Sequence, residues 1–177
     1  MNFVSIDPSL RNTGVVWGEI TSDDELVNLQ YILITTAPDS SKTIRKSSDL
    51  IKRCSEIYSR LIQIIKDVNP KITFIETPTG SQNYSSSISY AVSCYSAAII
   101  SPPPIEISPS EVKVSTVGDK TASKLKMINY VHSNYPYLLK LRKGVPTNDM
   151  EHIADAVCVA EAGLKSSTYK QLKSLTV

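Results

Sequence analysis

Three β-rich runs stand close together at the start of the chain, over residues 2–7, 14–20 and 29–36. The segments between them are short and polar, and they contain the proline, asparagine and glycine residues that favour turns. Parallel neighbours would need a long crossover, whereas short turns join antiparallel strands. The sequence therefore predicts an antiparallel meander at the start of the fold.

The rest of the chain alternates between helical and strand patterns. Apolar residues recur at helical spacing over 43–68, which is the strongest helix signal and ends at Asn69-Pro70. Beyond it we expect a strand at 72–76, a helix at about 84–100 and a strand at 105–107. A helix opening at Ser108-Pro109 and a helix at 121–134 follow. The chain then has an irregular segment at 135–146, a helix at about 149–164, and a last segment with little pattern or a frayed helix.

This order of elements predicts a mixed α/β fold, in which helices flank a five-stranded, partly parallel sheet. We expect one domain over residues 1–165 and a C-terminal tail over 166–177. A chain of 177 residues can bury a core without disulfides or a structural metal. Its 41% hydrophobic and 20% charged residues argue against a disordered chain.

The charge and cysteine content say more about the cellular compartment of the protein than about its binding partner. A net charge of +2 is too weak to indicate a polyanion, so nucleic-acid binding would require basic residues clustered on one face. Cys54, Cys94 and Cys158 lie far apart in apolar surroundings, which is typical of reduced thiols in an intracellular protein. No secretory signal and no apolar run of about 18 residues is present, so we expect a cytoplasmic location and no membrane partner.

Two isolated acids stand where predicted strands end. Asp7 follows the first apolar run, and Glu76 closes the run at 72–76. Carboxylates at such ends project into the crevice where open α/β sheets bind ligands. Taken singly, each acid is better explained by a structural role, as a turn cap or a residue at the rim of the sheet. Two acids on strands that could be neighbours make that explanation weaker.

The last predicted helix adds a third group of polar side chains. Glu151, His152 and Asp155 are spaced so that all three can share one helix face. Asp155 stands among apolar residues, where a carboxylate is costly unless it has a partner. That partner is either a divalent cation or, less specifically, an arginine or a capping contact. With Asp7 and Glu76, the set offers the oxygen-rich ligands that Mg²⁺ and Mn²⁺ prefer, and two such ions can cleave a phosphodiester.

The segment SIDPSLRNTG resembles the opening motif of the RuvC family of Holliday-junction resolvases. The family pattern is a strand, Asp-Pro-Gly and a polar turn, with Ser9 here in place of the usual glycine. The segment FIETP resembles the second strand motif of the family, with Glu76 as its acid and Asn83 seven residues later. Thr79 stands where many members carry an aromatic residue, and Tyr84 is the candidate to replace its stacking role.

Two later segments resemble the family in the same order. VKVSTVGDKTASK places Lys113 and Lys124 on the two functional lysines of the family. EHIADAVCVA resembles the final acidic helix, so that Asp155 matches its last acid. His152 falls where the best-known members carry aspartate and some carry histidine. Glu151 is left as a possible auxiliary acid.

The resemblance implies an RNase H-like fold and a crossover junction endodeoxyribonuclease, which cuts four-way DNA junctions by paired symmetric nicks as a homodimer. It also implies two Mg²⁺ or Mn²⁺ ions held by Asp7, Glu76, His152 and Asp155, with Lys113 and Lys124 at the phosphate. We expect no nucleotide cofactor. The apolar width of the helix at 84–100 indicates that part of it faces a twofold partner. The residues leave open whether a cellular or a phage genome encodes the chain; a phage member would act in the host cytoplasm.

Candidate DNA-binding residues lie outside this acidic set as well. The densest basic cluster is KLRKG, and the full set of candidates is Arg11, Asn83, Tyr84, Lys113, Lys124, Lys140, Arg142 and Lys143. The alternative without a function is that these charged residues simply form a solvated loop and helix surface. Three other functions stay open: an endonuclease of broader branched or flap DNA, a catalytically silent DNA-binding scaffold, and a sugar-kinase or actin-like ATPase, which normally needs a longer chain.

Overall fold

The computed structural model of the protein describes residues 1–41, 43–77, 84–100, 104–140 and 147–175. In this part of the chain five strands form one sheet, in the order β3-β2-β1-β4-β5. The strands are β1 (Asn2–Asp7), β2 (Asn12–Ile20), β3 (Leu26–Thr35), β4 (Ile72–Glu76) and β5 (Ile105–Ile107). β1, β2 and β3 pair antiparallel, whereas β4 pairs parallel to both β1 and β5. The predicted mixed sheet is therefore confirmed.

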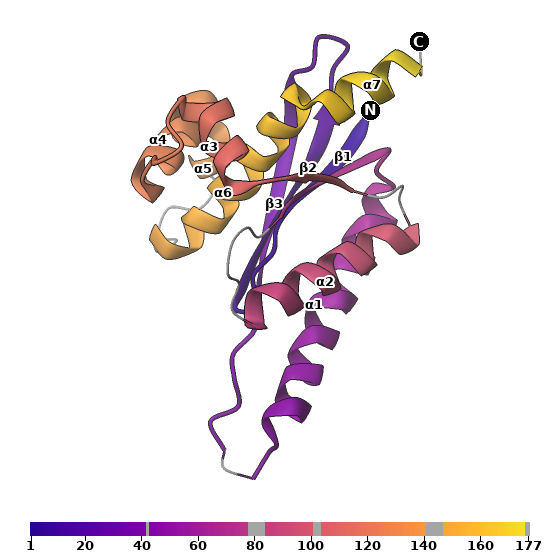
Figure 1. Ribbon diagram of the computed structural model, residues 1–177, viewed down its shortest axis with the longest axis vertical. Coiled ribbons are helices and arrows are strands. Elements are labelled where there is room, and N and C mark those ends of the chain that lie inside the picture. The colour runs from indigo at the N-terminus through magenta and orange to yellow at the C-terminus, as the bar shows by residue number, and fades with distance from the viewer. Residues whose placement is uncertain (42, 78–83, 101–103, 141–146, 176–177) are drawn as a thin grey trace.

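Helices cover both faces of the sheet (Figure 1). On one side lie α1 (Lys46–Val68) and α2 (Tyr84–Ile100). On the other lie α3 (Pro109–Val117), α4 (Lys124–Asn134), α5 (Pro136–Lys140) and α6 (Thr147–Lys165), and α7 (Ser167–Leu175) follows beside the β2–β3 hairpin. None of the helices in the described ranges is long and apolar enough to span a bilayer.

Side chains along β1 point alternately to the two faces of the sheet, and the core forms one hydrophobic cluster on each face. Val4 and Ile6 face α1, where they pack with buried residues of that helix such as Ile57 and Leu61. Phe3 lies on the opposite face and packs with α6. Because side chains alternate along a strand, residues 3, 5 and 7 share the α6 face. This register determines the side of the sheet to which the last residue of β1 belongs.

Two segments are more regular than the sequence analysis expected. Residues 136–140, predicted to be irregular, form the short helix α5, and residues 167–175 of the tail form α7. Tyr169 is only 2% exposed, and its ring lies 6.2 Å from that of Phe74 in β4. Its hydroxyl donates a hydrogen bond to Asp24 in the β2–β3 turn. Contacts between distant parts of the chain thus order α7, and a local pattern does not reveal such contacts.

Helix ends agree with their local sequence signals. Ser108 caps α3 by accepting a hydrogen bond from the Glu111 amide, while Glu111 accepts one from the Ser108 amide at 2.8 Å. Asn69 ends α1 in the left-handed conformation, at a φ of 46°. The second and third strands begin slightly earlier than predicted, at Asn12 and Leu26, because the pairing between β2 and β3 runs from Asn12 opposite Thr35 to Ile20 opposite Leu26.

Candidate active site

The two strand-end acids lie at the same end of the sheet, on its neighbouring inner strands β1 and β4. β1 and β4 run parallel, with Ile6 opposite Ile75, so that Asp7 and Glu76 end neighbouring strands. Both acids lie on the face covered by α6, since Phe3 and Phe74 of the same strands pack with that helix. Asp7 is 9% exposed. The pair therefore stands at a partly buried end of the sheet, as predicted from the sequence.

Small residues let α6 approach this end of the sheet closely. A Cβ atom on Gly14 would lie 2.1 Å from the carbonyl oxygen of His152, and one on Gly163 would lie 2.2 Å from the ring of Phe74. Ser5 donates a hydrogen bond of 2.7 Å to the carbonyl of Ala156. These contacts hold the polar face of α6 against the ends of β1 and β4.

His152 and Asp7 interact directly. Nδ1 of His152 lies 2.8 Å from Oδ2 of Asp7, and this hydrogen bond raises the pKa of the imidazole above its usual 6.5. One ring nitrogen is thereby engaged by a carboxylate. When that nitrogen carries the proton, Nε2 has the lone pair that a metal ion requires.

The other two acids carry strongly perturbed pKa values. Burial and the nearby Asp7 and Asp155 carboxylates raise the pKa of Glu76 to about 8. Burial, Asp7 and Glu151 raise the pKa of Asp155 to about 7. Both effects oppose the charged form, so the two carboxyl groups retain protons near neutral pH unless a cation compensates them.

This donor set fits a divalent cation chemically. Carboxylates with one imidazole suit Mn²⁺ and Mg²⁺, and a cation reverses the repulsion that raises these pKa values. As the side chains lie, no three His, Cys, Asp or Glu residues within the described ranges form a compact metal-binding group. Ligation of a cation would therefore bring these groups closer together than they are here.

A cavity of 190 Å³ opens beside the acids. Its polar lining consists of Glu76, Lys113, Lys124, Glu151 and Asp155, and its apolar lining comes from α3 and α4 and the turn between them. Lys124 forms an ion pair with Glu151. The cavity thus combines carboxylates with two ammonium groups, as a site for a phosphodiester and cations requires.

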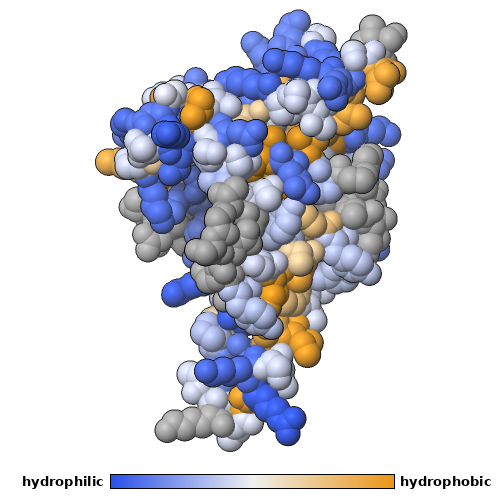
Figure 2. Space-filling view, in the orientation of Figure 1, coloured by the Kyte–Doolittle hydropathy of each residue, from blue (hydrophilic) through white to orange (hydrophobic). Residues whose placement is uncertain are grey.

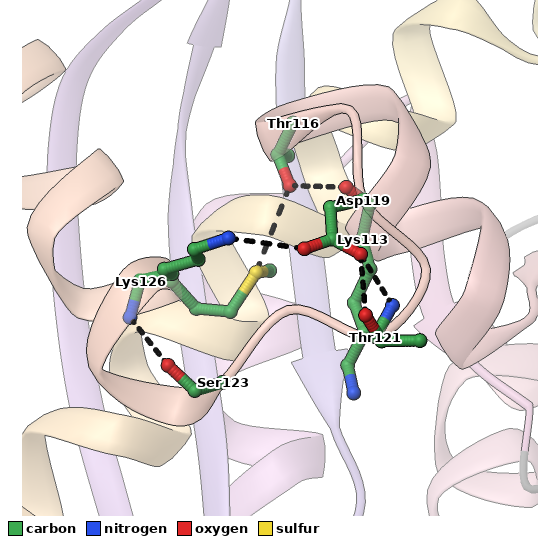
Figure 3. Close-up of polar contacts among 7 residues, drawn as sticks. Lys113, Thr116, Asp119, Thr121, Ser123 and Lys126 are labelled. Carbon is green, nitrogen blue, oxygen red and sulfur yellow. Dashed lines mark hydrogen bonds and ion pairs between the residues drawn. The ribbon is translucent and has the colours of Figure 1, made fainter.

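The turn between α3 and α4 brings both lysines to the cavity. Asp119 accepts hydrogen bonds from the amide and hydroxyl of Thr121, and it pairs with Lys126 at 3.0 Å (Figure 3). Ser123 caps α4 by accepting a hydrogen bond from the amide of Lys126. The Lys113 side chain extends away from this cluster of contacts (Figure 3). Hydrogen bonds and an ion pair thus hold this turn, while Lys113 is left to reach the cavity.

Of the remaining DNA-binding candidates, Arg11 and Tyr84 are described and do not line this cavity. Arg11 is exposed in the β1–β2 turn, and Tyr84 is 73% exposed at the start of α2. Lys140 ends α5, but its side chain is outside the described part of the chain, as are Asn83, Arg142 and Lys143 and the Thr79 position. For these residues the assignment stays a prediction.

Sequence reasoning missed two features of the site. It treated Glu151 as a possible auxiliary acid and did not connect it with Lys124, because they are 27 positions apart and no local pattern links them. It also treated Gly14 as a turn residue, although Gly14 is where α6 contacts β2. A small residue inside an apolar strand is the one signal that points to such close packing.

Comparison with known proteins gives a consistent result. No family model matches the chain. Two proteins from strains of Dehalococcoides mccartyi, each described as crossover junction endodeoxyribonuclease RuvC, are 30% identical to it over 165 residues. The matches cover 90% of this chain and 90% and 89% of the two relatives. The chain belongs to the RuvC family. Because the match covers 90% of this chain, it does not rest on one segment.

Solved structures agree on the fold. Thermus thermophilus RuvC in complex with a Holliday junction substrate superposes with a TM-score of 0.69 at 18% identity, covering 98% of this chain and 96% of that one. The yeast mitochondrial Holliday junction resolvase Ydc2 superposes with a TM-score of 0.55 at 11% identity, covering 99% and 84%. The sheet with three antiparallel and then parallel strands is thus the RuvC-like, RNase H-like arrangement predicted from the sequence.

Proposed function

We propose that the protein is a metal-dependent endonuclease that resolves four-way DNA junctions by paired symmetric nicks. Membership of the RuvC family supports the reaction class. The observation that carries the proposal is the meeting of Asp7, Glu76, His152 and Asp155 where β1 and β4 end against α6. These residues come from three distant parts of the chain, and the carboxylates among them repel one another when charged unless something positive lies between them.

Asp7, Glu76, His152 and Asp155 would hold Mg²⁺ or Mn²⁺, with two ions in the site. When bound, such ions polarise a water molecule and offset the charge that develops on a phosphodiester. Asp7 is positioned to serve both the ions and His152, since it already hydrogen-bonds the imidazole. Lys113 and Lys124, which line the same cavity, place positive charge where the phosphate enters. This chain thus supplies the ligands and the phosphate contacts from different elements.

We assign a homodimer interface to an apolar groove on the face of the sheet opposite α6. The groove has a volume of 630 Å³ between α1 and α2, with Leu50, Ile88 and Val92 in its lining. Ile51 and Tyr95 at its edges are 67% and 63% exposed. Figure 2 shows apolar surface in this lower part of the molecule. We assign this surface to the twofold partner, because paired cuts in a symmetric junction need two sites.

The DNA partner would also contact further residues of the chain. Arg11, Tyr84 and Lys140, with Asn83, Arg142 and Lys143, are proposed to contact the arms of the junction. Phosphodiester hydrolysis by this donor set needs no nucleotide cofactor. We also expect the activity to be in the cytoplasm, because the proposed substrate is DNA inside the cell.

The deciding experiment compares cleavage of four-way, Y-form, nicked and linear DNA of matched sequence with Mg²⁺ or Mn²⁺. We expect paired nicks in the four-way junction alone, no cleavage by Asp7→Asn, and junction binding by Asp7→Asn close to that of the original protein. Asp67→Asn is the matched control, since Asp67 is exposed on α1 and hydrogen-bonds only locally with Gln63. Equal cutting of Y-form DNA would indicate the broader branched-DNA endonuclease, and binding without any cleavage would indicate a silent scaffold.

A further inference from the structure

Lys124 and Glu151 form an ion pair at the cavity beside the acids. The two partners are unequally placed, because the side chain of Lys124 is 76% exposed and that of Glu151 is 15% exposed. The carboxylate is therefore held by its surroundings, while the lysine is a long, flexible chain whose end is restrained by the contact. An exposed lysine without such a partner would sample many rotamers.

Helix stability does not account for a lysine at this position. Lys124 is the first residue of α4, and the positive end of the helix dipole disfavours a cation there. Ser123 already caps the helix through the Lys126 amide. Docking of α4 on α6 is provided by Met127, Ile128 and Val131, which are buried in the same cluster as α6 residues. The ion pair is thus not needed to hold the two helices together.

Charge balance gives the pair a role at the cavity. Glu151 adds a fourth carboxylate to Asp7, Glu76 and Asp155, and by itself it would repel a phosphate group. Paired with Lys124 it is neutralised. An ammonium group has three N–H donors, so one contact with Glu151 leaves two for phosphate oxygens.

We propose that Glu151 is a positioning residue that holds the Lys124 ammonium at the mouth of the cavity, where it contacts the DNA phosphate, and that Glu151 is not a metal ligand. This inference rests on the proposed nuclease function. It assigns Glu151 a role that depends on Lys124, whereas a ligand role would depend on the cation.

The test combines three measurements on Glu151→Gln, Glu151→Asp, Lys124→Met and the Glu151→Gln/Lys124→Met double variant. The first is single-turnover cleavage of a four-way junction at saturating protein with Mn²⁺. The second is calorimetric binding of Mn²⁺ alone, with Asp155→Asn for comparison. The third is the ¹⁵N relaxation of the lysine ammonium groups without DNA. Lys173→Gln is the matched control, because it removes a partly exposed ion pair, with Asp24, whose residues are not in the lining of this cavity.

We expect Glu151→Gln to slow cleavage about tenfold, since a lost contact of about 1.4 kcal/mol in the transition state has that effect. Glu151→Asp should recover part of the rate, and Glu151→Gln should have almost no further effect when Lys124 is already methionine. Manganese affinity should stay within about twofold of the original, unlike that of Asp155→Asn. The Lys124 ammonium should become more mobile in Glu151→Gln, with Lys113 unchanged.

Three results would overturn the assignment. Glu151→Gln weakening Mn²⁺ binding as much as Asp155→Asn would make Glu151 a ligand. An equal loss of rate in the Lys124→Met background would show that Glu151 acts without Lys124. A rate equal to that of Lys173→Gln would show that it has no positioning role. If the original protein cleaves no branched DNA, the proposed function fails, while the ammonium relaxation still decides whether Glu151 holds Lys124.

Discussion

Nδ1 of His152 lies 2.8 Å from Oδ2 of Asp7, joining two residues that are 145 positions apart in the chain. The contact connects the end of β1 with α6, and Gly14 permits it by leaving room for the backbone of His152. An imidazole that hydrogen-bonds a carboxylate through one nitrogen is oriented to bind a metal through the other. The pair therefore unites the two elements that carry most of the acidic site.

The role of His152 predicts a metal preference and a pH limit. Mn²⁺ accepts a nitrogen ligand more readily than Mg²⁺, so cleavage should be faster with Mn²⁺. Asp7 raises the pKa of His152, so activity should fall as the pH drops toward 6.5, because protonated imidazole cannot bind a cation. His152→Asp should narrow the difference between the metals and extend activity to lower pH. Cleavage rates with each metal from pH 5.5 to 8.5 measure this. His132→Gln, at the exposed second histidine, is the control.

Stability without divalent cations should decrease as the pH rises. The pKa values of Glu76 and Asp155 are raised to about 8 and about 7, so the folded protein holds protons that the unfolded chain loses above pH 4–5. That stabilisation is complete below the unfolded values and is lost as the pH rises through 7 and 8. The lowered pKa values of Asp24 and Asp119 affect the free energy of unfolding only below about pH 4.

Urea unfolding in a chelator at pH 5, 6.5 and 8 tests this dependence. The free energy of unfolding should fall across the series, and Glu76→Gln, which stays uncharged, should flatten the fall. Added Mn²⁺ should restore stability at pH 8, since a cation binds only the folded site. A free energy that is constant or rises between pH 5 and 8 would contradict the arrangement of buried acids described above.

Gly14→Ala should damage both stability and activity. Its Cβ would lie 2.1 Å from the carbonyl oxygen of His152, so α6 must shift away from β2. We expect a loss of about 1–3 kcal/mol in the free energy of unfolding, which is typical of overpacking, together with slower cleavage. Gly118→Ala is the matched control, because a Cβ there meets nothing within 4 Å although φ is 71°. It should cost about 1 kcal/mol through backbone strain and leave cleavage unchanged.

Charged residues at the apolar groove should separate the proposed dimer. Ile51→Glu and Tyr95→Glu place carboxylates at the edges of the surface between α1 and α2, where burial against a second copy would be costly. Sedimentation should show a monomer, and paired nicks should become single nicks. Leu175→Glu introduces the same change at a residue that is 82% exposed on α7, and it should leave the dimer intact. Monomeric original protein with full paired cleavage would refute the interface.

Much of the site follows from local sequence. Asp7 and Glu76 each close a short β-rich run, and the last helix shows its acids at helical spacing, so their element and position can be predicted without a structure. Ser108 with Pro109 predicts the start of α3, and the capping contacts with Glu111 confirm it. These features depend on interactions over a few residues, which the local sequence determines directly.

Only the tertiary structure decides which of these residues meet. The hydrogen bond between His152 and Asp7, the ion pair of Lys124 with Glu151 and the burial of Tyr169 all join segments that are distant in the chain. The raised pKa values of Glu76 and Asp155 arise from the same packing, because burial and neighbouring charges exist only once α6 lies on the sheet. By itself the sequence determined the chemical groups and the elements that carry them, while the packing of α6 against β1, β2 and β4 decided their partners and protonation.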